Sequence, residues 1–254
     1  MFLRDDQLGP ARLSVTDRRG GSSRAPYAEL NLGGHVGDDP VLVDQNRRRL
    51  ADSLGVPSGR LLFMAQVHGS DVVVVDGSEL PPGPGRPVPE ADAMVTAEPG
   101  LALAVLVADC TPVLLASPQG GAHGVVRVAH AGRRGMAGGV VAATVSAMRR
   151  LGADPATTTA LVGPAICGRC YEVPAAMQAE VAAVEPASRS TTWSGTPALD
   201  VRAGVVAQLE AAGVTAIEVD PSCTAESDRL YSHRRDGVTG RFAGVACLLP
   251  TKAA

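Results

Sequence analysis

Aromatic residues are scarce in this chain: three Phe, three Tyr and one Trp make up 3 % of its 254 residues. Aromatic side chains are too few to fill the core, so we expect it to consist of Val, Leu and Ala. Hydrophobic residues reach 45 % and charged residues 19 %, which is ordinary for a globular protein. The length suits one large domain or two small ones.

Long apolar runs are also missing. The longest candidate, residues 101–107, has the length of a strand, and the charged N-terminal residues show no apolar core of a signal peptide. The cysteine count of five is odd, and no secretory signal favours disulfide pairing. We therefore expect reduced thiols, a cytoplasmic protein and no membrane partner.

Several ligand classes lack their usual sequence signals. The formal net charge of -3 argues against a general electrostatic grip on nucleic acid, so we expect no nucleic-acid partner. Neither a GxxxxGK[ST] loop nor a strand-linked GxGxxG occurs, so a triphosphate or a dinucleotide is not indicated. Five histidines are few for a multicopper cluster, which needs several imidazoles for each group of copper ions.

Hydrophobic periodicity predicts more strands than helices. We expect strands at 13–16, 61–64, 72–75, 101–107, 113–116, 125–129, 161–162, 217–219 and 242–249, the first of them at a sheet edge. We expect helices at 41–54, 137–151, 175–184 and 201–212, with Asp39, Pro40 and Gly55 bounding the first. Residues 80–89 are dominated by Pro and Gly and predict an exposed loop. Because several strands are consecutive, the pattern favours mixed sheets over a regular βαβ fold.

Three segments at the ends of hydrophobic strands each carry a side chain suited to metal binding: QVHG at 66–69, ADCTP at 108–112 and AHAGRRG at 129–135. His68, Cys110 and His130 are together the ligands that a catalytic zinc ion takes when its fourth position stays open. Histidines and cysteines at such positions are more often structural. The separations of 42 and 20 residues match no local metal-binding spacing, so the pattern leaves open whether the three converge.

Other polar residues have both a structural and a functional interpretation. Five arginines lie in turn segments: Arg18, Arg133, Arg134, Arg234 and Arg235. Such arginines are usually solvated, but Arg also binds phosphate through two hydrogen bonds, which fits a small phosphate ligand. Asp109 is either a turn residue or an acceptor that orients a histidine ligand. The CGRC segment at 167–170 is half of a zinc knuckle, a redox pair or a simple turn, and Cys223 and Cys247 cannot supply a second CxxC.

Many short motifs, in order along residues 13–249, resemble those of the laccase-domain family, also called the YfiH-like or multicopper polyphenol oxidase family. The motifs are TDRRGG (16–21), NLG (31–33), GDD (37–39), QVHG (66–69), ADAMVT (91–96), ADC (108–110), AHAG (129–132), GPAI (163–166), CYEV (170–173) and the segment 232–241. Members of this family are regarded as purine nucleoside phosphorylases.

The resemblance implies a single domain over residues 1–254, of the α+β class, arranged as a four-layer α/β/β/α sandwich with mixed sheets. It implies a zinc site formed by His68, Cys110 and His130, and we expect that copper can replace the zinc in vitro. It implies phosphorolysis of adenosine, inosine and methylthioadenosine, with adenosine deamination as a side activity in which zinc activates water. We expect a monomer or a weak homodimer.

Catalytic roles are therefore predicted for the three metal ligands and for Asp109. Residues predicted to bind substrate or phosphate are Arg18, Gln66, Arg134 and Asn31. One departure from the family pattern is Arg133, where relatives commonly have Trp. An aromatic side chain there could stack on a purine, and Arg can also stack but adds charge.

Three alternatives remain open. Copper-dependent phenol oxidation would have to recruit His35 and His123 as further ligands. A metal-free hydrolase would use Cys110 as nucleophile and His130 as base, with the adjacent aspartate or Gln66 as accessory, on amides such as peptidoglycan precursors. A non-catalytic scaffold would not need polar, glycine-rich loops with Arg, His and Cys at strand ends.

Overall fold

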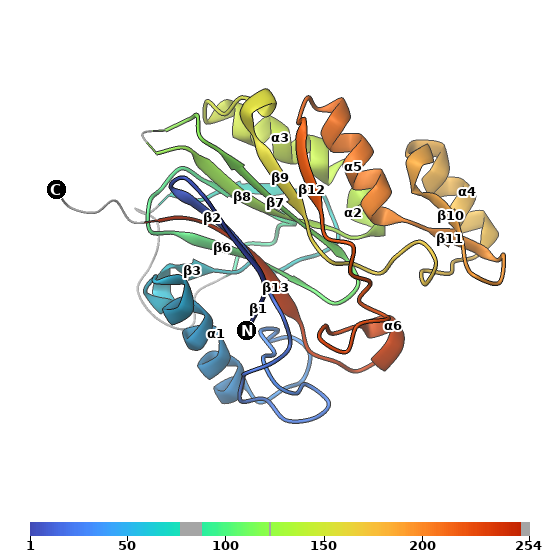
Figure 1. Cartoon of the computed structure of the whole chain (residues 1–254), viewed down its shortest axis with the longest axis horizontal. Coiled ribbons are helices and arrows are strands. Elements are labelled where there is room, and N and C mark those ends of the chain that lie inside the picture. The colour runs from blue at the N-terminus through green and yellow to red at the C-terminus, as the bar shows by residue number, and fades with distance from the viewer. Residues whose placement is uncertain (77–87, 122, 250–254) are drawn as a thin grey trace.

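Two large β-sheets, a two-stranded hairpin and six α-helices are formed by the residues that the computed structural model describes, which are 1–76, 88–121 and 123–249 (Figure 1). The first sheet has the spatial order β1 (Phe2–Leu8), β2 (Ala11–Thr16), β13 (Phe242–Leu248), β6 (Ala102–Val107) and β3 (Leu61–Leu62). The second has the order β12 (Ala216–Val219), β9 (Thr159–Val162), β7 (Thr111–Ser117), β8 (Val125–Ala131), β5 (Ala93–Thr96) and β4 (Val72–Val74). A separate hairpin joins β10 (Arg189–Thr191) and β11 (Pro197–Leu199). The helices are α1 (Pro40–Leu54), α2 (Arg133–Ala137), α3 (Val140–Arg150), α4 (Ala175–Val184), α5 (Val201–Ala211) and α6 (His233–Asp236).

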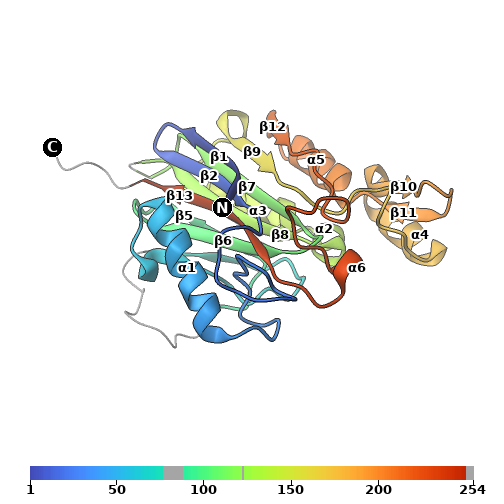
Figure 2. The same cartoon turned by 60° about the horizontal axis from the view of Figure 1, so that its bottom comes forward.

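The two sheets pack face to face through an aliphatic core. Leu13 and Val105 of the first sheet meet Leu114 and Val128 of the second, and all four are at most 1 % exposed. Helix α1 covers the outer face of the first sheet, whereas α3 and α5 cover the outer face of the second (Figures 1 and 2). Each sheet contains both parallel and antiparallel pairs. The predicted α+β fold, a four-layer α/β/β/α sandwich with mixed sheets, is therefore confirmed.

Helix α1 forms as its sequence signals indicate. The Asp39 side chain accepts a hydrogen bond from the Val41 amide at 2.8 Å, and Pro40 occupies the first helical position. Gly55 ends the helix with φ 74°, a left-handed conformation that glycine adopts without steric cost. Within the described part of the chain, no helix is long and apolar enough to cross a membrane.

Three local predictions need correction or lie outside the described residues. The strand at 13–16 was expected at a sheet edge, but β2 pairs with β1 on one side and with β13 on the other. Strand β1 escaped prediction because its charged residues stay partly exposed at the true edge. The helix expected at 137–151 is α3, which begins only at Val140 because Gly139 has φ 86° and interrupts the helical path, and the short α2 before it was not expected. The loop expected at 80–89 lies mostly outside the described residues.

The connections between the sheets converge at one end of the sandwich. Strand β6 of the first sheet leads through residues 108–110 directly into β7 of the second sheet. Strand β8 pairs with β7 and ends beside this crossover, with Thr111 opposite Ala131. Residues 66–69 lie between β3 and β4, and thus also pass from the first sheet to the second. The fold thereby brings the three segments that carry His68, Cys110 and His130 to the same place.

Candidate functional site

His68, Cys110 and His130 converge, so their strand-end positions form a single cluster. Their ligand atoms all lie within 4.8 Å of one another. Cys110 Sγ is 3.8 Å from His68 Nε2, and the two imidazole rings meet edge to face with centroids 4.7 Å apart. His68 is exposed, Cys110 is partly buried and His130 is buried, so the cluster opens toward solvent on one side. We call these three residues the triad.

Asp92, at the start of β5, holds two parts of the triad. Its carboxylate is fully buried and accepts a hydrogen bond from His130 Nδ1 at 2.8 Å. The same carboxylate accepts the amides of His68 at 2.9 Å and Gly69 at 2.6 Å, and so supports His68 in its unusual φ of 62°. Because Nδ1 of His130 is occupied in this way, Nε2 is left to bind a metal.

Asp109 does not orient a histidine, which was the functional interpretation of its position beside Cys110. Its carboxylate instead accepts the Thr224 hydroxyl at 2.6 Å and the backbone amide of Arg234 at 2.7 Å. Its φ of 96° lies outside the usual range for a residue with a side chain, and such strain is found at sites that the surrounding structure fixes. The histidine-orienting role belongs to Asp92. The sequence carried one signal for it, a lone carboxylate between the apolar residues Ala91 and Ala93.

Ionisation within the triad is strongly coupled. Burial opposes ionisation of Cys110, but hydrogen bonds with His130 and His68 lower the pKa of its thiol to about 6. Burial also opposes protonation of His130, but hydrogen bonds with Asp92 and Cys110 raise its pKa to about 9. Both shifts favour a thiolate on Cys110 beside an imidazolium on His130. Such a thiolate is the form that binds a metal or acts as a nucleophile.

The triad lies in the wall of a cavity of about 480 Å³, a size within the usual range for small-molecule sites. The other polar residues of this wall are His35, Gln66, Asp109, Arg133, Tyr171, His233, Arg234 and Arg241. Burial and the charges of Arg241 and Arg47 lower the pKa of His35, so positive charge is concentrated beside the triad. The Nε atom of Arg133 is buried and has no hydrogen-bond partner in the described part of the chain.

Not all of the residues predicted to bind substrate face this cavity. Gln66 lines it, and its amide group makes two hydrogen bonds of 2.8 Å with the backbone of Leu106. Arg18 instead lies over the Tyr231 ring, 4.7 Å from its centroid, and donates to Ala28 O. The phosphate or substrate roles of these residues stay predictions.

Arg134 and Asn31 also lie outside the cavity wall. Arg134 is exposed on α2, one residue beyond Arg133. Asn31 is buried, and its Oδ1 accepts the amides of Gly33 at 2.9 Å and Arg241 at 2.8 Å. Asn31 is thus a positioning residue for Arg241, which lines the cavity. Arg241 was not singled out from the sequence, although it ends the motif segment 232–241.

The donor set of the triad fits a catalytic zinc ion. Imidazole nitrogen and thiolate sulfur are both zinc ligands, and three protein ligands leave the fourth tetrahedral position open. The exposed side of His68 and the adjoining cavity give such a position access to a small molecule. The described residues contain no second histidine-containing group of three or more ligands, so the multicopper arrangement that would recruit His35 and His123 has no support in the side-chain geometry.

Comparisons with known proteins cover nearly the whole chain. Residues 12–249 match the family described as multi-copper polyphenol oxidoreductase laccase. A purine nucleoside phosphorylase of Streptomyces coelicolor is 58 % identical over 248 residues, which cover 98 % of this chain and 100 % of that protein. A purine nucleoside phosphorylase of Streptomyces griseus is 57 % identical over 240 residues, 94 % of this chain and 95 % of that protein. The crystal structure of YlmD from Geobacillus stearothermophilus has a TM-score of 0.85 at 37 % identity, and the match covers 94 % of this chain and 92 % of that one. The chain therefore belongs to the multi-copper polyphenol oxidoreductase laccase family.

Proposed function

We propose that this chain is a zinc-dependent purine nucleoside phosphorylase. Adenosine, inosine or methylthioadenosine would react with phosphate to give the free base and the sugar 1-phosphate. The observation that carries the proposal is the triad in the wall of a cavity that also contains cationic side chains. The names of the relatives at 58 % and 57 % identity support the same reaction.

Arg241 is the residue that we assign to phosphate. Its Nη1 donates to the carbonyls of Thr239 at 3.1 Å and Gly240 at 3.0 Å, which fixes the guanidinium, and the other guanidinium nitrogens make no hydrogen bond with the described residues. Its amide is held by Asn31, and it lies close enough to Cys110 for their charges to interact. A fixed guanidinium of this kind binds phosphate through two charge-assisted hydrogen bonds without further ordering.

Arg133 is the residue that we assign to the purine base. It occupies the position where the pattern of the resembled family has Trp, and it lies in the cavity wall, within the segment 129–135 that carries His130. A planar guanidinium stacks on a ring much as an aromatic side chain does. Its buried Nε, which lacks a partner among the described residues, could donate to an acceptor on the base.

The reaction breaks the bond between C1′ and the base nitrogen and forms a bond between C1′ and a phosphate oxygen. The electron pair leaves with the base, which must gain a proton, while positive charge develops on the sugar. Asp109 lines the cavity, and its carboxylate, fixed by Thr224 and Arg234, would stabilise this charge. A zinc ion held by the triad would supply a Lewis acid with an open position.

Two substitutions separate the assigned roles. Arg241→Lys keeps the charge but loses paired hydrogen bonds, so we expect the KM for phosphate to rise by at least about tenfold. Arg133→Lys should instead raise the KM for the nucleoside. Arg48→Lys, on the exposed face of α1, is the matched control. If Arg134→Lys alone raises the KM for phosphate, the assignment to Arg241 is wrong.

We also propose adenosine deamination as a side activity, because an open metal position beside a nucleoside cavity suits activation of water. The test is formation of inosine from adenosine by the zinc-loaded chain in the absence of phosphate. If inosine forms equally in a Cys110→Ala variant, the activity comes from elsewhere. Cytoplasmic localisation and a monomeric or weakly dimeric state stay predictions.

A metal-free Cys–His hydrolase is the second candidate, because one specific observation favours it. Cys110, His130 and Asp92 stand in the order of nucleophile, base and orienting acid, and the thiol pKa is lowered to about 6. Asp92 takes the accessory role that was expected of the aspartate beside Cys110 or of Gln66. The two candidates differ in metal content: a fully active metal-free preparation that iodoacetamide inactivates at Cys110 would support the hydrolase.

A further inference from the structure

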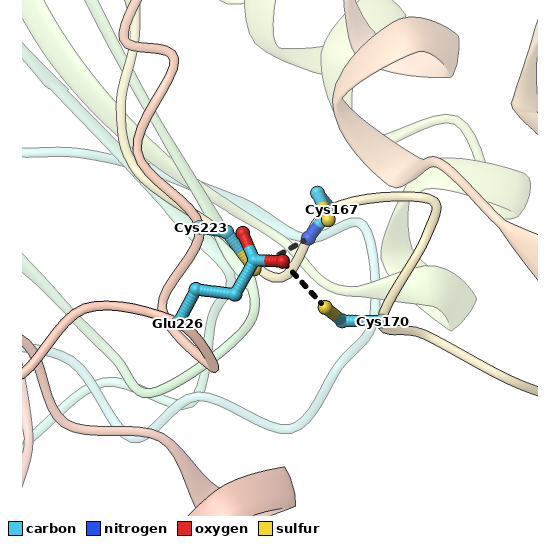
Figure 3. A group of neighbouring side chains, drawn as sticks. All are labelled: Cys167, Cys170, Cys223 and Glu226. Atoms are coloured by element: carbon cyan, nitrogen blue, oxygen red, sulfur yellow. Dashed lines mark hydrogen bonds between the residues drawn. The ribbon is translucent and has the colours of Figure 1, made fainter. Parts of the chain in front are cut away.

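We propose a second metal site in this chain, formed by Cys167, Cys170, Cys223 and Glu226, that binds zinc as a structural ion. Their three sulfur atoms and one carboxylate oxygen all lie within 4.8 Å of one another. The four side chains converge from two segments that are far apart in the sequence (Figure 3). The site is separate from the triad and contains none of its residues.

The sequence contains both halves of a zinc knuckle, and the second half has Glu in place of one Cys. The first half is the CGRC turn at 167–170, and the second is the CTAE segment at 223–226, where Glu replaces the second Cys at the same spacing. The backbone confirms that the halves match. The amide of Cys170 donates to Cys167 O at 3.0 Å, and the amide of Glu226 donates to Cys223 O at 3.2 Å. Both turns are therefore closed by the same backbone hydrogen bond, from the fourth residue to the first.

The distances are close to those of a tetrahedral zinc site. With zinc–sulfur bonds of about 2.3 Å and zinc–oxygen bonds of about 2.1 Å, neighbouring sulfurs lie about 3.8 Å apart and a sulfur and an oxygen about 3.6 Å apart. Cys170 Sγ is already 3.4 Å from Glu226 Oε1, and the widest separation, 4.8 Å at most, needs a contraction of about 1 Å. The amide of Cys167 also donates to Cys223 Sγ at 3.4 Å, a bond that stabilises a sulfur ligand (Figure 3).

Four ligands from the protein distinguish this site from the triad. A closed set of four is typical of structural zinc, whereas three ligands with an open position are typical of catalysis. Its sulfur-rich donor set also favours zinc over magnesium or calcium, which prefer oxygen ligands. We therefore assign it a structural role.

A metal at this site would fix the positions of residues in one wall of the cavity. Ile166 and Tyr171 flank the first turn, and both line the cavity. Thr224 lies within the second turn and donates its hydroxyl to Asp109 at 2.6 Å. Joining the two turns through one ion fixes these residues relative to each other. Metal binding would thus stabilise this part of the cavity wall, where the loops alone would otherwise have to order several side chains.

The decisive experiment is zinc stoichiometry in the full chain, stripped of metal under reducing conditions and then titrated with zinc alone. The wild-type chain should bind two equivalents, and the Cys110→Ala chain, which lacks the triad thiolate, should retain one. Cys110→Ala with Cys223→Ser should bind none, whereas Cys110→Ala with Cys247→Ala should still bind one. Cys247 is a buried cysteine of β13 outside the site and is the matched control.

Two further measurements guard against loss of folding. With cobalt in place of zinc, sulfur-to-metal absorption in the Cys110→Ala chain should be about three times that of the Cys223→Ser chain, because three thiolates are compared with one. In the Cys110→Ala chain, Glu226→Gln, at an exposed position, should lower the zinc affinity of the site formed by Cys167, Cys170, Cys223 and Glu226 by at least about tenfold. Glu180→Gln, exposed on α4, should not change it.

Several outcomes would overturn the proposal. One is a Cys110→Ala chain that melts like the wild type yet binds no zinc. Another is a bound zinc that persists after Cys223→Ser is added to Cys110→Ala. A third is a fully reduced chain that takes up no second zinc, while the untreated chain shows a disulfide between two of these cysteines. That result would identify a redox pair.

Discussion

Replacing Gly132 by Ala adds one methyl group beside the triad while every ligand stays in the chain. A Cβ atom at this position would lie 2.9 Å from His68 Cδ2 and 3.1 Å from Cys110 Sγ. Non-bonded carbon atoms normally lie about 3.5–4.0 Å apart. The backbone at Gly132 has φ -74° and ψ 169°, which Ala adopts without strain. The cost of the substitution therefore falls on the triad itself.

The magnitude follows from the size of this overlap. Relieving it needs a shift of roughly 0.5 Å in His68 or Cys110, whereas metal–ligand distances tolerate about 0.2 Å. Overpacking of this kind costs about 1–3 kcal/mol. That free energy corresponds to a loss of about 5- to 150-fold in affinity. We expect Gly132→Ala to weaken zinc binding at the triad by a factor in this range.

The assay is competition for zinc between the metal-stripped chain and a chromophoric chelator. It is performed in a Cys223→Ser background, so that only the triad takes up the metal. The control is Gly59→Ala, because a Cβ there would have no atom within 4 Å and the position is exposed. If Gly132→Ala binds zinc as tightly as its parent and has the same melting temperature, His68 and Cys110 do not hold the metal as argued.

Three further predictions concern buried charges. Asp92→Asn removes the acceptor of His130 Nδ1, so zinc affinity at the triad should fall by about 10- to 100-fold in the same competition assay. Burial opposes ionisation of Asp17, but hydrogen bonds from Arg229 and other donors lower the pKa of its carboxyl group. The stability that Asp17 contributes should therefore be present above the unfolded-state pKa of about 3.9 and be lost as pH falls through the lower folded-state pKa. Urea unfolding should show the stability gap between the wild type and Asp17→Asn closing below about pH 4, and a gap that stays constant to pH 2 would refute this. Arg127 is fully buried, and its guanidinium has no hydrogen-bond partner in the described part of the chain. Arg127→Met should therefore raise the free energy of unfolding by about 1–4 kcal/mol. A less stable variant would indicate an unrecognised partner of Arg127.

The sequence was most informative where the relevant signal is local. Asp39, Pro40 and Gly55 bounded α1 because capping acts within a few residues of a helix end. The apolar strands were also visible, since each is shorter than a helix and is bounded by turn residues. The placement of His68, Cys110 and His130 at strand ends was readable as well. The convergence of these three residues could not be predicted, because it depends on which strands belong to each of the two sheets and on where the chain passes between them.

Sequence reasoning failed where partners are distant or charged. Asp92 is 38 residues from His130, and no local pattern connects them. Cys170 and Glu226 are 56 residues apart, so the second half of the knuckle was not recognised as one. Strand β1 was missed because its charged residues break the apolar alternation. Ion pairs compensate for this: the Arg12 guanidinium of β2 contacts Asp5 at 2.7 Å.

The central claim is tested most directly by a product assay on the zinc-loaded chain with adenosine and phosphate. The account predicts free adenine and ribose 1-phosphate in equal amounts. Both should disappear after the metal is removed and in the Cys110→Ala variant, and return only in the wild type when zinc is restored. A zinc-loaded wild-type chain that turns over no nucleoside would contradict the account.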